Sequence, residues 1–93
     1  MILSFKDKRT EAVAGGEASK GFPAELVRAA QRKLAMLDAA LRLEDLRSPR
    51  GNKLHALSGD RKGQHAIRIN DQFRLCFRWS EGGAKDVEII DYH

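Results

Sequence analysis

The segment from Phe73 to Trp79 constrains the fold more than any other part of the chain. Its residues alternate between large apolar side chains and arginine or cysteine, in the order Phe73, Arg74, Leu75, Cys76, Phe77, Arg78 and Trp79. An apolar pattern of period two is typical of a β-strand that packs one face on a core and leaves the other accessible. We therefore expect a sheet whose apolar face is covered by another layer and whose opposite face carries arginines.

Two further strands complete a C-terminal meander. Residues 64–69 also alternate, and Asn70 and Asp71 follow them as a plausible hairpin turn, since both residue types tolerate positive φ. Residues 80–83, with two glycines, turn the chain again, and residues 87–91 read as the last strand. The pattern predicts a three-strand, mainly antiparallel meander.

The covering layer comes from the first half of the chain. A helix is expected from Pro23, because an apolar stripe follows at helical spacing: Leu26, Ala30, Leu34, Leu37 and Leu41. Residues 2–5 read as a short first strand, residues 7–13 as a helical turn or short helix, and residues 43–46 as a further turn before the loop at 48–51. The predicted class is α+β, with the N-terminal strand and helices packed on the sheet in one domain, residues 1–93.

Composition indicates the cellular compartment and excludes some kinds of site. The single cysteine excludes an intramolecular disulfide and a Cys-rich zinc site. No apolar run reaches the length of a signal peptide or of a transmembrane helix, which takes about 20 residues. We expect a cytoplasmic protein without a membrane partner.

Positive charge is concentrated in the second half. The net charge is +4, and residues 47–78 carry eight Lys or Arg against only Asp60 and Asp71. Such asymmetry indicates an anionic partner, with nucleic acid first, although a solvated basic surface explains the charge alone equally well. Arg68, Arg74 and Arg78 would share the accessible face of the sheet, where guanidinium groups can hold phosphate.

Three histidines are candidates for proton transfer. His55 would point outward between Leu54 and Leu57, whereas His65 shares a face with apolar residues and favours a packing or supporting role. His93 closes the chain directly after Asp91 and Tyr92, and a tyrosine there could pack or stack on a base. No metal-ligand spacing and no glycine-rich phosphate loop is present.

Metal-free RNA cleavage fits these groups. RNA supplies its 2′-hydroxyl as nucleophile, so the protein needs a base, an acid and cations around the phosphate. His55, Arg74, Asp91 and His93 provide these functions.

Several segments carry a resemblance to a known family. They are Ile2-Leu3-Ser4-Phe5-Lys6, Gly21-Phe22-Pro23, Lys53-Leu54-His55-Ala56-Leu57-Ser58-Gly59-Asp60-Arg61-Lys62-Gly63, Ile67-Arg68-Ile69-Asn70-Asp71-Gln72-Phe73-Arg74-Leu75 and Asp91-Tyr92-His93. Together they resemble the HigB-type toxins of the RelE/ParE superfamily of bacterial toxin–antitoxin systems. The likeness spans nearly the whole chain.

The resemblance implies a compact RelE-like fold and an mRNA interferase that cuts mRNA in the ribosomal A site without metal or other cofactor. It places Arg74 on the scissile phosphate and Tyr92 as a stacking or positioning residue. His55 and His93 are the acid/base candidates, with either one as the acid or the base, and Asp91 is an orienting group or a base. Further contacts to RNA phosphates are expected from the remaining basic residues of the site, Lys53, Arg61, Lys62, Arg68 and Arg78.

The implied partners are the ribosome with its mRNA and a cognate HigA-type antitoxin with a helix-turn-helix fold. Operator DNA would be bound only through that antitoxin. One departure is Ser58, where relatives often have lysine, and Lys53, Arg61 or Lys62 would have to compensate for the missing charge.

Two other functions remain open from the sequence. A ParE-like toxin would inhibit DNA gyrase by binding, with no RNA chemistry, and a non-catalytic module would bind RNA or ribosomes without cutting. His55 and the terminal Asp91-Tyr92-His93 favour the nuclease, but a shared fold does not decide function.

Overall fold

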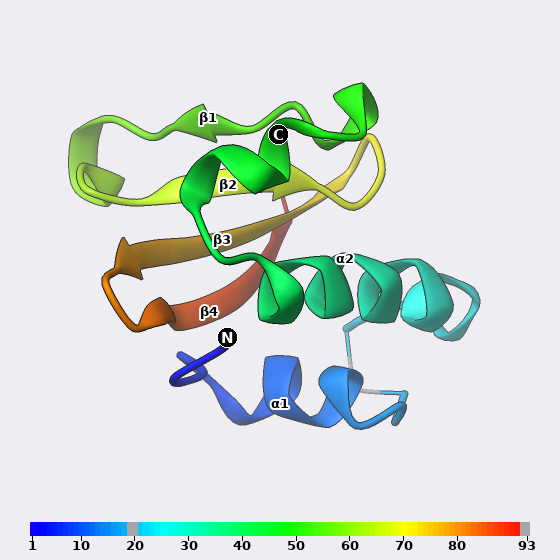
Figure 1. The fold of residues 1–93 in the computed structure, drawn as a ribbon. Coiled ribbons are helices and arrows are strands. Elements are labelled where there is room, and N and C mark those ends of the chain that lie inside the picture. The colour runs from blue at the N-terminus through cyan, green and yellow to red at the C-terminus, as the bar shows by residue number, and fades with distance from the viewer. Residues whose placement is uncertain (19–20, 92–93) are drawn as a thin grey trace.

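A computed structural model describes residues 1–18 and 21–91 of the chain. Its centre is a four-stranded antiparallel sheet in the order β1-β2-β3-β4, with two α-helices packed against it (Figure 1). The strands are β1 (His55–Ala56), β2 (His65–Arg68), β3 (Phe73–Ser80) and β4 (Gly83–Asp91). The predicted α+β class and the meander of β2, β3 and β4 are confirmed, and β1 adds a short edge strand that the sequence pattern did not indicate.

The alternation along β3 places its side chains as predicted on the core side. Phe73, Leu75 and Phe77 are buried, and Trp79 is partly buried at the end of the strand. Cys76 lies on the opposite face yet has no exposed surface. That face is therefore not fully open to solvent.

The β2–β3 hairpin turns at the predicted residues, but its turn is stabilised in a different way. Asn70 and Asp71 are absent from the residues with positive φ, so the expected left-handed turn is wrong. Instead, the Asn70 side-chain Oδ1 accepts hydrogen bonds from the backbone N–H groups of Gln72 (3.0 Å) and Phe73 (2.7 Å). A side-chain amide thus replaces the backbone conformation as the source of the turn.

The N-terminal segment joins the far edge of the sheet. Residues 2–5 form two isolated parallel bridges to β4, Ile2 to Ala84 and Phe5 to Val87, rather than a continuous strand. The chain then enters α1 (Lys8–Ala14), whose start is capped by the Asp7 carboxylate. The predicted short helix is confirmed, and the predicted first strand is reduced to two contacts.

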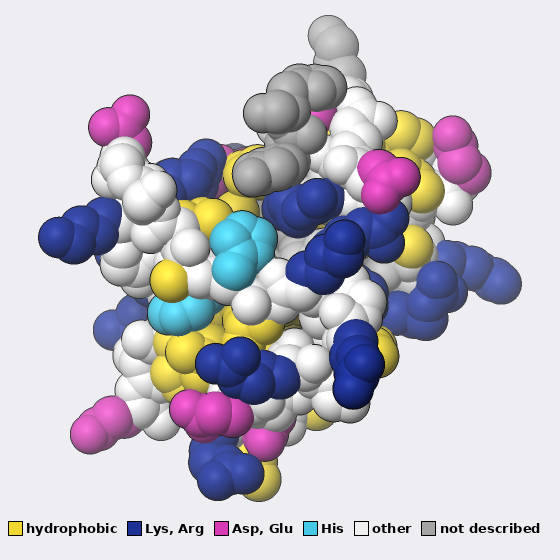
Figure 2. Space-filling view, turned by 90° about the horizontal axis from the view of Figure 1, so that it is seen from above, with side chains coloured by type: hydrophobic (Ala, Val, Ile, Leu, Met, Phe, Trp, Pro, Cys, Tyr) yellow, Lys and Arg dark blue, Asp and Glu magenta, His cyan; other side chains and the backbone are white. Residues whose placement is uncertain are grey.

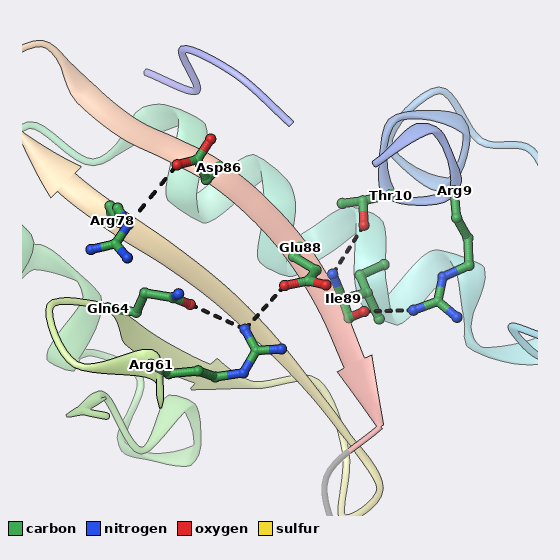
Figure 3. Close-up of polar contacts among 8 residues, drawn as sticks. All are labelled: Arg9, Thr10, Arg61, Gln64, Arg78, Asp86, Glu88 and Ile89. Atoms are coloured by element: carbon green, nitrogen blue, oxygen red, sulfur yellow. Dashed lines mark hydrogen bonds and ion pairs between the residues drawn. The ribbon is translucent and has the colours of Figure 1, made fainter. Parts of the chain in front are cut away.

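Helix α1 is tied to β4 by polar contacts (Figure 3). The buried hydroxyl of Thr10 accepts the Ile89 N–H at 3.0 Å, and Arg9 Nη2 donates to the Ile89 carbonyl at 2.6 Å. These bonds satisfy backbone groups of the outer strand that no further strand pairs.

The principal helix covers the apolar face of the sheet. After Pro23 the chain forms a 3-10 turn, η1 (Ala24–Leu26), and then α2 (Val27–Ala39). Ala30, Leu34 and Leu37 are buried as expected, whereas Leu41 is 88% exposed because the helix ends at Ala39 and its period no longer applies. Leu41 was therefore wrongly predicted to belong to the core stripe.

Short 3-10 turns connect α2 to the sheet. They are η2 (Leu43–Arg47), η3 (Arg50–Asn52) and, between β1 and β2, η4 (Gly59–Arg61). None of the described helices is both long and apolar enough to cross a membrane.

Candidate active site

The strand register brings His55 and two arginines to one face of the sheet. His55 pairs with Ala66, and Ala66 in turn pairs with Cys76, so these three side chains point the same way. Arg68 and Arg74 are direct partners in the neighbouring row of the same face. Two residues along a strand cover about 6.6 Å, so the rows lie within the reach of long side chains.

His55 is exposed on the edge strand and its ring is oriented by the backbone. Its Nδ1 lies 2.8 Å from the carbonyl oxygen of Lys53, a residue with left-handed backbone (φ 48°) two positions before His55. A carbonyl can only accept, so Nδ1 carries the proton in this contact. In the neutral ring the lone pair then belongs to Nε2, which is the atom that can take a proton from a substrate.

Arg74 is fixed at the hairpin end of the same face. Its Nη1 donates to the carbonyl oxygens of Asn70 and, at 3.2 Å, of Phe73. The side chain is half-buried, so the guanidinium is held in place rather than swinging in solvent. A fixed planar cation is suited to a phosphate whose charge grows during reaction.

Asp91 reaches the same end of the sheet from β4. It pairs with Phe73, one residue from Arg74, and its Oδ2 accepts a hydrogen bond from Gln72 Nε2 at 3.2 Å. By strand alternation its side chain lies on the same face as Phe73, opposite the face that carries Arg74. The structure therefore brings Asp91 to the end of the sheet near Arg74 without placing it on the face of the arginines.

The other predicted phosphate ligands on this face have carboxylate partners. Arg61 bonds Glu88 at 3.0 Å and Gln64 at 3.2 Å, Arg68 pairs with Asp71, and Arg78 lies 4.0 Å from Asp86 (Figure 3 shows the first and last pairs). A bound phosphate would have to compete with these carboxylates. The basic surface is thus more charge-compensated than the sequence indicates.

Electrostatic effects follow from these contacts. The hydrogen bond from Arg68 lowers the pKa of Asp71, which keeps that exposed carboxylate ionised. Burial raises the pKa of Cys76 to about 11, so its thiol stays protonated beneath the Arg61–Glu88 pair. Cys76 is therefore not a nucleophile of the site.

The remaining candidates are distributed as follows. Lys53, Ser58 and Lys62 are exposed around the β1–β2 connection. His65 stacks on Phe77 with ring centroids 6.4 Å apart, which confirms the packing role predicted for it. Tyr92 and His93 lie outside the described residues, so the roles predicted for them stay predictions.

A small cleft beside His55 was not predicted from the sequence. It measures about 150 Å³ and lies between η2 and β1, lined by Leu43, Glu44, Arg47, Leu54, His55, Ala56 and His65. A two-residue strand has no periodicity to reveal it, so the sequence held no signal for this pocket. Seen from above, histidine side chains lie near Lys and Arg side chains on this side of the molecule (Figure 2).

No set of three His, Cys, Asp or Glu side chains gathers at metal-binding distance within residues 1–18 and 21–91. The groups that this face offers are the His55 imidazole and the guanidinium groups of Arg68 and Arg74. Such a set can move a proton and stabilise a charged phosphate.

Comparison with known proteins identifies the family. Residues 3–93 match the HigB-like toxins, RelE-like toxins of the type II toxin–antitoxin system HigB. The chain belongs to this family. Its match covers almost the whole sequence and confirms the resemblance carried by the motifs around His55, Arg74 and Asp91.

Individual relatives match most or all of the chain. Toxin HigB-1 of Vibrio cholerae is 42% identical over 94 residues, covering 100% of this chain and 98% of that protein. Endoribonuclease HigB of Proteus vulgaris is 32% identical over 93 residues, covering 100% of both chains. An uncharacterised protein of Haemophilus influenzae is 34% identical over 78 residues, covering 84% of this chain and 76% of the other. The toxin is thus one component of a type II system, which implies an antitoxin partner.

Proposed function

We propose that this toxin is an mRNA interferase, an endoribonuclease that cuts mRNA in the ribosomal A site and so stops translation. The name of the Proteus vulgaris relative supports endoribonuclease activity. The observation that carries the proposal is the placement of His55, whose Nδ1 lies 2.8 Å from the Lys53 carbonyl oxygen, on the face that also presents Arg68 and Arg74. We accordingly expect the toxin to act in the cytoplasm.

The proposed reaction uses the substrate's own nucleophile. His55 Nε2 takes the proton of the 2′-hydroxyl, and the 2′-oxygen attacks the adjacent phosphorus. The bond from phosphorus to the 5′-oxygen breaks, and an acid, for which His93 is the candidate, protonates that oxygen. The products are a 2′,3′-cyclic phosphate and a 5′-hydroxyl.

Arg74 has the electrostatic role. Negative charge accumulates on the phosphate oxygens as the 2′-oxygen attacks, and a guanidinium already fixed by backbone carbonyls needs little reorganisation to meet it. Asp91 orients a histidine or shares the work of the base, and Tyr92 stacks on or positions the substrate. Lys53, Lys62, Arg68 and Arg78 hold flanking phosphates, whereas Arg61 is bound by Glu88.

Primer extension on a defined mRNA, with and without programmed ribosomes, tests the proposal. The native toxin runs beside His93→Ala. Cuts at A-site codons that require ribosomes and disappear in the variant support both the activity and the C-terminal site. Ribosome-dependent cuts that persist in His93→Ala refute the acid assignment.

Absence of cuts under every condition would refute the nuclease proposal. DNA supercoiling by gyrase would then be the next assay, because a ParE-like toxin inhibits that enzyme. Retained ribosome or RNA affinity without products, and insensitive to His55→Ala, would indicate a binding module.

Ser58 provides a graded test of the same site. It is exposed at the start of η4, within the basic β1–β2 connection. Ser58→Lys adds one positive charge near the substrate backbone, so we expect faster single-turnover cleavage at low salt and a smaller gain at high salt. An unchanged rate at every salt concentration would show that Arg61, Lys62 or Lys53 already supplies this charge.

The proposed partners follow from the family. We expect a HigA-type antitoxin with a helix-turn-helix fold, and binding of operator DNA through that antitoxin alone. DNA binding measured for the toxin, the antitoxin and their complex separately tests this expectation.

A further inference from the structure

An open groove lies away from the candidate active site. It measures about 730 Å³ and is bounded by the N-terminal segment, the end of α1 and one side of α2. Its lining comprises Ile2, Phe5, Ala14, Arg28, Gln31, Arg32, Leu34, Ala35 and Asp38. In Figure 1 the N-terminal segment and α1 lie along α2 at the opposite side of the molecule from β1, which carries His55.

Helix α2 presents a second side to this groove. Val27, Ala30, Leu34 and Leu37 turn toward the core, while positions 28, 31, 32, 35 and 38 follow each other at helical spacing along the groove. Ala35 is exposed in the middle of this side, so a partner can approach the helix backbone closely there. One exposed side of α2 therefore forms a continuous wall of the groove.

Its floor is apolar and its rim is positive. Ile2, Phe5, Ala14 and Leu34 supply the floor. The rim carries the exposed Arg28 and Arg32, and neither has an acidic partner among residues 1–18 and 21–91.

The acidic end of the groove is already engaged. Asp38 accepts the backbone N–H of Ile2 at 2.8 Å. Its carboxylate therefore ties the N-terminal segment to α2 and does not compensate the rim arginines.

Exposed apolar residues continue the surface beyond this end. Met1 is 62% exposed and Leu41 is 88% exposed, and the Met1 amino group lies 3.5 Å from the Ala40 carbonyl, so the two apolar side chains flank the same corner. Large side chains that stay exposed beside a groove mark a surface that a protein partner covers. RNA would leave this apolar area unpaired, since phosphates need cations and not a hydrocarbon floor.

We propose that this groove is the docking surface for the antitoxin. The chemistry that fits is an amphipathic segment, apolar toward Phe5, Leu34 and Ala35 and acidic toward Arg28 and Arg32. The proposal rests on membership of a type II toxin family, which implies such a partner, and not on the nuclease activity. The arrangement leaves His55 and its face of the sheet outside the docking surface.

Charge reversal at the rim and blockage of the floor test the proposal. The two variants are Arg28→Glu/Arg32→Glu and Ala35→Arg, and the matched control is Lys8→Glu/Lys85→Glu, which makes the same charge change at exposed positions outside the groove. Biolayer interferometry measures the Kd for the cognate antitoxin, cloned from the same operon. Circular dichroism establishes that each variant folds.

We expect the rim variant to bind the antitoxin about 100-fold more weakly, with a reduced salt dependence, because two attractive contacts become repulsive. Ala35→Arg should weaken binding without removing charge complementarity, and the control should bind like the native toxin. Ribosome-dependent cleavage by free toxin should be the same in all four proteins. The affinities stand as a result even if the native toxin cuts no RNA, so failure of the proposed activity and failure of this proposal remain distinct.

Native antitoxin affinity in both folded groove variants would overturn the proposal. Loss of ribosome affinity with the antitoxin Kd unchanged would assign the groove to ribosomal RNA. A native dimer that becomes monomeric in the variants, again with the antitoxin Kd unchanged, would assign it to a second copy of the chain.

Discussion

Replacing His55 tests the proposed chemistry most directly. The side chain is exposed on a two-residue edge strand, and its ring bonds only the nearby Lys53 carbonyl among the hydrogen bonds of the described residues. Truncation at such a surface position typically changes the free energy of unfolding by no more than about 0.5 kcal/mol. Loss of activity in His55→Ala can therefore be separated from loss of folding.

The expected loss of rate is much larger than any effect on stability. A positioned general base contributes about 10²- to 10⁴-fold to a proton-transfer step. Since Nδ1 is held by the Lys53 carbonyl and Nε2 carries the lone pair, we expect His55→Ala to lose catalysis within this range. His55→Asn should fall as far, because an amide can accept a hydrogen bond but cannot take up the proton.

Single-turnover cleavage on programmed ribosomes is the appropriate assay. Chemistry must be slower than ribosome binding, so toxin is used in excess and the rate at saturation is followed. Both variants should show the loss at saturation, where a defect in ribosome binding no longer contributes. Lys8→Glu/Lys85→Glu serves again as the control for non-specific effects of substitution.

Two results would refute this reasoning. A rate within about tenfold of native in His55→Ala would be too small an effect for a general base. A His55→Asn rate close to native would show that a hydrogen-bond acceptor suffices at this position and that His55 does not take up the proton. Asp91→Asn and His93→Ala would then be the variants to compare.

Further predictions address the phosphate site, the thiol and the core. Arg74→Ala should slow single-turnover cleavage about 10²- to 10³-fold, and Arg74→Lys should restore part of it because the charge returns without the planar fork; equal rates for native and Arg74→Ala would refute the assignment. Cys76, with its pKa raised to about 11 from 9.0, should hold about 100-fold less thiolate at pH 8 than an unfolded thiol, so a thiol reagent should label it only after denaturation. Rapid labelling of the native protein would contradict this burial of the thiol. Because the pKa of Cys76 is higher in the folded than in the unfolded protein, the free energy of unfolding should fall as pH rises from 9 toward 11. Asn52→Ala should lower the free energy of unfolding by about 2 kcal/mol in urea titration, since buried Asn52 donates to the carbonyls of Leu46 (3.1 Å) and Ser48 (3.4 Å) and accepts from Lys33; a shift below about 0.5 kcal/mol would refute the role of this network.

The sequence predicted the parts of the fold that depend on long periodic segments. Strand β3 has eight residues and α2 has thirteen, so the spacing of their apolar residues predicts which side is buried. The pattern failed where periodicity ends. Leu41 continues the helical spacing after the helix has stopped, and β1 is too short to show any alternation.

The candidate site divides in the same way. That His55, Arg68 and Arg74 share a face followed from alternation once the register was known, and the family resemblance named the same residues. The ion pairs could not be foreseen, because Arg61 and Glu88 are 27 residues apart and meet only when β2, β3 and β4 are aligned. The hydrogen bond that fixes the His55 tautomer depends on the unusual φ of Lys53, which no composition rule indicates.

These ion pairs also distinguish arginines that the sequence alone predicted to be equivalent phosphate ligands. They differ in how firmly a carboxylate holds each one. Asp71 is 98% exposed, so water and salt weaken its hold on Arg68, and a phosphate can displace it at small cost. Glu88 is only 21% exposed and its pair with Arg61 covers Cys76, which has no exposed surface. Removing Arg61 from Glu88 would leave a carboxylate poorly solvated and would open the sheet above the thiol. We therefore expect Arg68 to act with Arg74 on the substrate, and Arg61 to serve mainly as a cover for the sheet.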